Sequence, residues 1–266
     1  MKKIYLIALT MIACTFLAST NAGAQEFEWP DLGTPMIIEP GAPGVLDATI
    51  NGDTAADGTM NHQHYILRRG AMYLYIFETI NTGWDLMVTA EEGDGPLPII
   101  KALGTPPGGD EALRPFVAQG NLYLQGLNIH GWANDGLPTD NATVRLNSDD
   151  ITGVLKDCIF DYNRQNSLRL NGANISAFVE NCLFYGQGTA SKVSNGESVH
   201  FRGNPAKIVH LRNNTLVNNT DLFMDNRQTQ EYDTFIADHN TMVNSGRRGA
   251  FLGRPQNLTW TNNLIV

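Results

Sequence analysis

Three short segments of the chain share one pattern and together carry four basic residues. The segment "VRLNS" carries Arg145, "LRLNG" carries Arg169, and "VHFRG" carries both His200 and Arg202. Apolar residues occupy alternate positions around them, which is typical of a strand with one buried face and one outward face. We therefore expect the four side chains to project outward from neighbouring strands and to form a single positive strip.

The chemistry that such a strip could perform is the recognition of an anion. Two guanidinium groups stacked about 4.8 Å apart repel one another, and like charges placed directly opposite each other destabilise a sheet. A bound carboxylate would remove the repulsion, because guanidinium and carboxylate form a bidentate pair. The alternative is that the long arginine stems lie over the sheet and their heads reach water or a nearby acid such as Asp225. The sequence favours neither interpretation over the other.

A histidine between two arginines indicates proton-transfer chemistry. One reaction that needs both a carboxylate-binding group and a base is the cleavage of a uronic acid chain by elimination. In this reaction the carboxylate is neutralised, the proton on the adjacent carbon is removed and the glycosidic oxygen is released. Arg169 and Arg202 could neutralise the carboxylate, and His200 has the proton affinity of a general base. We predict these three as the catalytic residues. The competing interpretation of His200 is an exposed strand residue without a task.

The same register predicts further contacts with the substrate. The predicted substrate-binding residues are Arg145, Asn171, Phe223, Asp225, Phe251 and Arg254. Phe223 and Phe251 would continue the outward column of His200 and offer apolar faces to sugar rings. Arg145 would stand in that same column, whereas Asn171 and Asp225 would lie in the neighbouring outward column, with Arg254 just beyond its end.

Metal-binding patterns are weak in this sequence. The segment "NHQHY" holds His62 and His64 without an acidic third ligand, and such pairs are more often loop residues. The doublet in "SDD", residues 148–150, is typical of a solvated turn. Asp225 alone is too little for a calcium site. We therefore predict no metal ligand, and calcium stays open as a cofactor.

A repeated phrase positions these segments. When similar segments are aligned, one column contains Leu127, Cys158, Cys182, Asn214, Asn240 and Asn263. The spacings along this column are 31, 24, 32, 26 and 23 residues, with apolar residues two positions later and three positions earlier. Such periods indicate a solenoid, and the alternation of apolar and polar residues indicates strands. The sequence therefore predicts a parallel β-helix whose coils stack at about 4.8 Å.

The polar residues of this column have a physical reason to recur. Asparagine tolerates left-handed backbone where a coil bends, and its amide can bond to the asparagine stacked on the next coil. Cys158 and Cys182 occupy the same column, and their side chains would point the same way, which is a poor geometry for a disulfide. We interpret the two cysteines as small buried fillers.

The segments "NNTL", "HNTM" and "NNLI", with their coil period, resemble the asparagine ladder of the right-handed parallel β-helix superfamily typified by pectate lyases. The segment "PGVLDATI", residues 43–50, is similar to the short helix that caps the first coil in that superfamily. Residues 65–80, 85–92 and 97–103 resemble its first strands. The resemblance covers about residues 40–266 and implies the fold without a single activity. Members include polysaccharide lyases, glycoside hydrolases, pectin methylesterases and non-catalytic adhesins.

The N-terminus predicts export. "MKK" is followed by an apolar run and by an Ala-x-Ala pattern ending at Ala24, which is typical of a cleaved signal peptide over residues 1–24. The apolar run is short for a membrane span, and a retained anchor or lipidation at Cys14 are the alternatives. We expect a secreted, periplasmic or cell-surface protein with one β-helix domain over residues 25–266. Its cap would cover about residues 40–60 and its coils about residues 62–266.

Charge is distributed unevenly along the chain. The net charge is −9; residues 1–150 hold 18 acids and 7 bases, whereas residues 151–266 hold 9 acids and 11 bases. The C-terminal part, at +2, suits an anionic partner. The overall acidity and the predicted export argue against nucleic acid as that partner.

Together these observations predict an exported protein that binds an anionic, uronic acid-containing polysaccharide and, as a lyase, cleaves it by β-elimination. The alternative is a non-catalytic β-helix used for adhesion or surface display. The last segment, "LTWTNNLIV", ends inside a coil phrase. We therefore also expect the chain to be a fragment, with further coils after Val266 in the native protein.

Overall fold

The computed structural model describes residues 27–105, 113–139, 142–189, 195–202, 204–221, 223–226, 231–244, 246 and 250–266. Residues Leu32–Val266 form one compact unit, and the described residues before Leu32 belong to another. The predicted signal peptide over residues 1–24, including Cys14, lies outside the described residues. Within the described part of the chain, no helix is both long enough and apolar enough to span a membrane.

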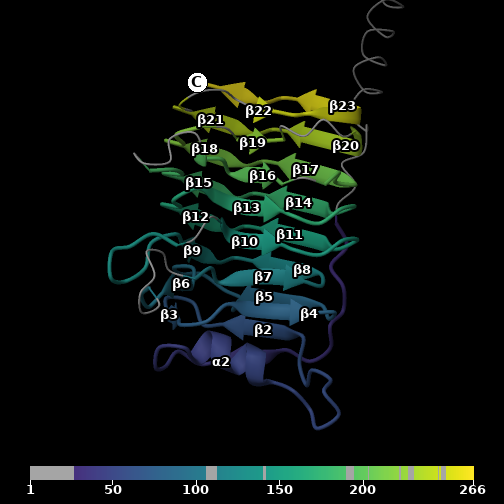
Figure 1. The fold of residues 1–266 in the computed structure, drawn as a ribbon. Coiled ribbons are helices and arrows are strands. Elements are labelled where there is room, and N and C mark those ends of the chain that lie inside the picture. Colours follow the sequence, from purple (N-terminus) through teal and green to yellow (C-terminus); the bar gives the residue numbers. More distant parts are fainter. Residues whose placement is uncertain are drawn as a thin grey trace, which may run out of the picture. The chain divides into compact units, whose positions relative to one another are not determined.

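Successive coils of the unit Leu32–Val266 add their strands in turn to three sheets (Figure 1). Among the described residues, sheet 1 consists of nine strands: β1 (Met36–Ile38), β2 (His64–Leu67), β5 (Leu86–Ala90), β8 (Leu122–Gln125), β11 (Thr152–Lys156), β14 (Ser176–Glu180), β17 (Ile208–Arg212), β20 (Glu231–Asp238) and β23 (Arg254–Thr261). Sheet 2, within the same described ranges, consists of eight: β3 (Met72–Tyr75), β6 (Ile99–Ala102), β9 (Asn128–His130), β12 (Ile159–Asp161), β15 (Leu183–Tyr185), β18 (Thr215–Val217), β21 (Thr241–Val243) and β24 (Leu264–Ile265). Sheet 3, again counting described residues, consists of seven: β4 (Thr79–Thr82), β7 (Phe116–Gln119), β10 (Ala142–Leu146), β13 (Asn166–Leu170), β16 (Val199–Phe201), β19 (Met224–Asp225) and β22 (Ala250–Phe251).

Neighbouring strands within each sheet are parallel throughout. Parallel pairing of strands that recur once per coil is the defining feature of a parallel β-helix. The predicted all-β parallel solenoid is therefore confirmed.

The strand register confirms the predicted columns of apolar residues. One column runs through Leu124, Leu155, Val179, Leu211, Ala237 and Trp260. The other runs through Ile129, Phe160, Phe184, Leu216, Met242 and Ile265. Except for Trp260 and Ile265 in the last coil, all of these residues are buried, and the rings of Phe160 and Phe184 stack with centroids 5.2 Å apart. The stacked columns form the core between the three sheets.

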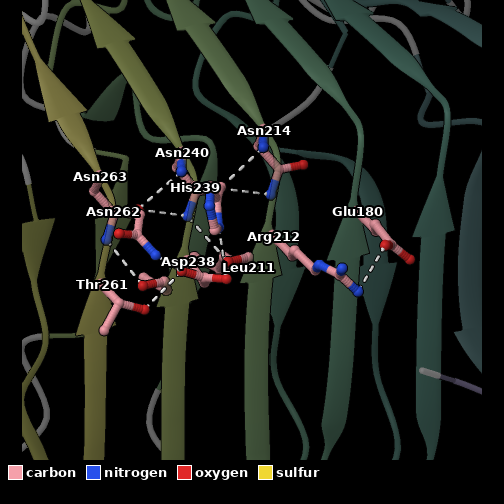
Figure 2. A network of polar contacts seen from close by, with 11 residues as sticks. Glu180, Leu211, Arg212, Asn214, Asp238, His239, Asn240, Thr261, Asn262 and Asn263 are labelled. Carbon is pink, nitrogen blue, oxygen red and sulfur yellow. Dashed lines mark hydrogen bonds and ion pairs between the residues drawn. The ribbon is translucent and has the colours of Figure 1, made fainter. Parts of the chain in front are cut away.

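The asparagine column forms a ladder of hydrogen bonds at the turn between sheets 1 and 2 (Figure 2). The Oδ1 atom of Asn240 accepts from the backbone N–H and the Nδ2 of Asn214, at 3.0 and 2.9 Å. Its Nδ2 donates to the carbonyl of Leu211 and to Oδ1 of Asn263, at 3.0 and 2.8 Å. Asn214 and Asn240 are fully buried, so the ladder satisfies backbone groups that water cannot reach.

The backbone of this turn differs from the prediction in one respect. The left-handed residues are not the ladder residues but the ones immediately before them: Asp157, Asn181, Asn213, His239 and Asn262, with φ between 52° and 55°. These side chains are exposed, and Nδ2 of Asn181 donates to Oδ1 of Asp157 on the preceding coil. The left-handed residue turns the chain, and the residue after it can then point its amide into the interior.

Cys158 and Cys182 are free, buried thiols in the ladder column, as predicted. The Sγ atom of Cys182 donates to the carbonyl of Leu155 at 3.5 Å. This bond corresponds to the one that Asn240 makes to the carbonyl of Leu211. Each cysteine therefore replaces one hydrogen bond of a ladder asparagine, the bond to the carbonyl of the preceding coil, but it lacks the second N–H donor and the oxygen acceptor of the amide.

We expect the substitution Cys182→Asn to extend the ladder by one coil. The new Nδ2 would lie within reach of the Leu155 carbonyl and of Oδ1 of Asn214, which replaces a weak thiol donor by an amide. The free energy of unfolding should rise by roughly 0.5–1.5 kcal/mol, measured by urea denaturation. Cys182→Ser, which is small and cannot reach the next coil, serves as the control. A lower unfolding midpoint for the asparagine variant than for the serine variant would contradict this expectation.

Helix α2 (Val45–Gly52) covers the first coil, where the sequence predicted a capping helix. Asp47 is 1% exposed, and its carboxylate accepts the backbone N–H groups of Ile76 and Phe77 at 3.2 and 2.9 Å. These two residues lie between β3 and β4. The helix is therefore tied to the chain at the point where it enters sheet 3.

Candidate anion-binding site

The predicted basic residues meet on the outer face of sheet 3. Arg145 pairs with Arg169 between β10 and β13, and Arg169 pairs with His200 between β13 and β16. Arg202 follows β16 directly, and its backbone N–H donates to the carbonyl of Leu170 at 2.8 Å. We call Arg145, Arg169, His200 and Arg202 the basic strip. The predicted register of these residues is confirmed, while their roles stay a prediction.

The basic strip is half-buried, and this strengthens its field. Arg169 is 9% exposed, whereas Arg202 at the rim is exposed. Burial, followed by the charges of Arg202, Arg145 and Arg114, lowers the pKa of Arg169 to about 10, against an opposing effect of Glu197. The side chain still carries its charge at neutral pH. Like charges held together away from water form a site that favours an anion.

The strip continues toward β4 through a further arginine that sequence reasoning did not single out. Arg114 precedes β7, and its Nη1 lies 3.2 Å from Oε1 of Glu78. Burial lowers the pKa of Arg114, Glu78 raises it and Arg145 lowers it again. For Arg145 the main cause of the lowered pKa is likewise burial. Arg114 is thus near enough to act on the charges of Arg145 and Arg169, while its own charge is paired with Glu78.

Two buried acids flank His200. Glu197 is 0% exposed and Asp225 is 1% exposed. Nδ1 of His200 lies 3.8 Å from Oε2 of Glu197 and 3.9 Å from Oδ2 of Asp225. These distances are too long for hydrogen bonds, but the two carboxylates favour a proton on Nδ1. That tautomer leaves Nε2 as a proton acceptor.

Sequence reasoning missed Glu197 and placed Asp225 in the wrong column. Glu197 lies before β16, three residues from His200, and its Oε2 accepts from Nδ2 of Asn166 at 2.6 Å. Because Glu197 lies outside the strand, the alternation of apolar and polar residues does not indicate where its side chain points. The only signal in the sequence is an acid three residues before a candidate base, which is too common to be informative.

The same three side chains could hold a divalent cation. Glu197, His200 and Asp225 each offer one ligand atom, and these atoms lie within 4.8 Å of one another. One imidazole with two carboxylates is a zinc-type set rather than the all-oxygen set that calcium prefers. The guanidinium of Arg169 next to this cluster repels a cation. The surroundings of His200 therefore suit a general base better than a metal ligand.

The register beyond His200 differs from the prediction by two residues. Asp225, and not Phe223, pairs with His200. Phe223 is fully buried in the core, so its expected contact with a sugar ring is wrong. A shift of two residues keeps the same side chains facing outward within a strand, so the sequence pattern cannot reveal it. Phe223 itself lies just before β19, which consists of Met224 and Asp225, so the strand alternation does not decide where its side chain points. Phe251 pairs with Asp225 and is 39% exposed, so it faces outward as expected.

The two remaining predicted contacts fall on different faces. Asn171 follows β13 beside the basic strip, and its Nδ2 donates to Oδ1 of Asn147 at 2.9 Å. Arg254 begins β23 in sheet 1, where it pairs with Glu231. Its expected place next to the strip is therefore wrong. The chain leaves sheet 3 after β22 through Gly253, whose φ of 68° carries it to the next sheet.

The weaker sequence candidates have structural explanations. Nδ1 of His62 contacts Oδ2 of Asp53 at 2.8 Å, and Nε2 of His64 contacts Oγ1 of Thr89 at 2.9 Å. Asp149 accepts a backbone N–H from the next coil at 2.7 Å, as a turn residue would. These contacts hold loops and strands together.

A second titratable pair, which was not predicted, lies on sheet 2. Asp161 pairs with His130 between β12 and β9, with Oδ1 and Nδ1 3.8 Å apart. Burial raises the pKa of Asp161 to about 6 and lowers the pKa of His130. A carboxyl group with a raised pKa is a candidate proton donor. The pair belongs to a different sheet from the basic strip, so the two do not form one site.

The basic strip is the group of side chains on sheet 3 whose types could bind an anion. It combines a half-buried row of guanidinium groups with one imidazole between acids. No protein-family model matches the chain, and no curated protein matches it in sequence.

Proposed function

We propose that this protein is an exported, right-handed parallel β-helix of the pectate lyase-like kind. It binds an anionic, uronic acid-containing polysaccharide on sheet 3 and cleaves it by β-elimination. The observation that supports this most is the direct pairing of Arg145 with Arg169 in a half-buried column that continues to His200. Directly opposed like charges destabilise a sheet, and carboxylates bound along the column would offset the repulsion.

In the proposed reaction, Arg169 and Arg202 bind one uronate carboxylate and draw charge away from it. Nε2 of His200 takes the proton from the carbon next to that carboxylate. The released electron pair forms a C=C bond as the C–O bond to the leaving sugar breaks, and the leaving oxygen takes a proton from water. The buried charges of Glu197 and Asp225 stabilise the imidazolium that results.

Removing one guanidinium from the strip should weaken polysaccharide binding. We expect Arg169→Ala and Arg202→Ala each to reduce affinity by about 1–3 kcal/mol, because each loses a charge-assisted contact. Thermal stability should change little, since a repulsion is lost together with the contact. Calorimetric titration against polygalacturonate and alginate would measure both variants.

Arg254→Ala is the matched control for these variants. It makes the same change of charge, but its side chain lies on sheet 1, so affinity should stay at the native value. A neutral polysaccharide should bind neither the native protein nor the variants. Unchanged affinity in both Arg169→Ala and Arg202→Ala would contradict an anion site on sheet 3.

Cleavage itself is tested by the ultraviolet absorbance of unsaturated products over a panel of uronic polysaccharides. The native protein should release such products from at least one of them. If it binds a uronic polysaccharide and releases none, the elimination reaction is wrong, and the non-catalytic adhesin is the function that remains.

A further inference from the structure

A cavity of about 380 Å³ opens beside helix α2 at the first strand of sheet 3. Its apolar lining includes Met60, Ile80 and Trp84, and its polar lining includes Thr54, Thr82 and Glu78. Aromatic and aliphatic walls combined with a few hydroxyl and carboxylate groups suit a sugar ring, which has apolar C–H faces and hydroxyl edges.

The cavity continues the basic strip along the same face. Ile80 and Thr82 are the exposed, outward residues of β4, which alternate with buried neighbours. Ile80 pairs with Val117 on β7, and Val117 pairs with Arg145 on β10. Four strand spacings separate Ile80 from His200, which is about 19 Å. One extended ligand that crosses the strands of sheet 3 from coil to coil could therefore occupy both the cavity and the strip.

A column of hydrogen-bonding side chains runs beside the charged column. Thr82 pairs with Gln119, and its Oγ1 donates to Oε1 of Gln119 at 2.7 Å. Asn147 and Asn171 continue this column after β10 and β13, and Arg202 follows after β16. Uronic acid chains carry hydroxyl groups as well as carboxylates. The two columns supply partners for both kinds of group from the cavity to His200.

We propose that the cavity is a sugar-binding subsite for the same polysaccharide, in which a ring packs against Trp84. This inference rests on the proposed function, because the bound sugar belongs to the chain held by the strip. Glu78 is the one charged group in the described lining, and it is paired with Arg114. The subsite therefore recognises a ring and its hydroxyls rather than a carboxylate, and it makes recognition depend on chain length.

The test is the binding of oligogalacturonates and oligomannuronates of increasing length, from two to about eight units, a range chosen to exceed the roughly 19 Å track. Affinity of the native protein should first increase as the oligomer becomes long enough to cover the basic strip, and should increase a second time at the length that reaches the cavity. Tryptophan fluorescence should change only for oligomers of that length or longer. Trp84→Ala should weaken binding of the long oligomers about 5- to 10-fold, as expected for a lost aromatic contact. It should leave binding of the short oligomers unchanged.

Two further variants guard against a folding defect, because Trp84 also packs against the core. Trp84→Phe keeps an aromatic face and should retain most of the affinity for long oligomers. Thr82→Ala removes an exposed hydroxyl and should weaken only the long oligomers. Thermal unfolding of each variant shows whether it is folded.

The possible failures are distinguishable. If no oligouronate binds the native protein, the proposed function fails and the subsite fails with it. If Arg169→Ala weakens binding at every length while Trp84→Ala and Thr82→Ala weaken it at none, the polysaccharide site stands and the subsite alone is overturned.

Discussion

His200→Ala should lower the rate of polysaccharide cleavage by about 10²–10⁴-fold, the usual contribution of a general base. Binding should change little, because Arg169 and Arg202 keep their contacts with the carboxylate. The reason is geometric: the acids on either side of Nδ1, at 3.8 and 3.9 Å, favour a proton there and leave Nε2 to accept the substrate proton. Initial rates of formation of unsaturated product, measured at saturating polysaccharide, would give the effect on turnover.

Two variants serve as controls for that result. His200→Gln keeps a polar side chain of similar reach but cannot act as a base, so it should be as inactive as the alanine variant. His210→Ala removes a histidine from the middle of β17 in sheet 1 and should keep full turnover per folded molecule. Cleavage by His200→Ala at the native rate would show that the base lies elsewhere.

Asn240→Ala should lower the free energy of unfolding by about 3–5 kcal/mol. The side chain is fully buried and makes four hydrogen bonds in the ladder of Figure 2. Alanine would leave the backbone N–H of Asn214 and the carbonyl of Leu211 without these partners, and each buried unpaired group costs about 1–3 kcal/mol. The loss would be measured as a shift of the urea unfolding midpoint.

The ladder also supplies its own controls. Asn257→Ala removes an exposed asparagine from β23 and should change stability by at most about 0.5 kcal/mol. Asn240→Cys should be less harmful than Asn240→Ala, because the thiol of Cys182 already donates to the corresponding carbonyl. An alanine variant as stable as the native protein would mean that the ladder contributes nothing to stability.

Local patterns in the sequence were enough to predict the coil and its columns. The phrase around Asn214 and Asn240 recurs with apolar residues at fixed offsets, and the strand register follows those offsets through six coils. The reason is that a stacked coil places equivalent residues directly above one another, so each column repeats the same environment. The outward placement of Arg145 and Arg169 follows from the same alternation.

The surroundings of His200 could not be derived in this way. Glu197 lies outside a strand. Asp225 occupies the position expected for Phe223 because the register after His200 is shifted by two residues, and Phe223 is buried in the core instead. The alternation of apolar and polar residues is the same before and after a shift of two residues, so it cannot reveal the shift. The position opposite His200 therefore carries a buried carboxylate and not the expected aromatic ring, which changes its chemistry.

The sequence by itself determined the fold, the buried columns and the face on which the basic strip lies, because these depend on periods of two residues within a strand and of one coil along the chain. Only the tertiary structure decided which side chains from different coils meet. It brought Glu197 and Asp225 to His200, joined Arg114 to the strip, moved Arg254 to sheet 1 and set a cavity lined by Trp84 at the end of the same face. These meetings depend on the lengths and paths of the connections between strands, and no periodic pattern in the sequence records those paths.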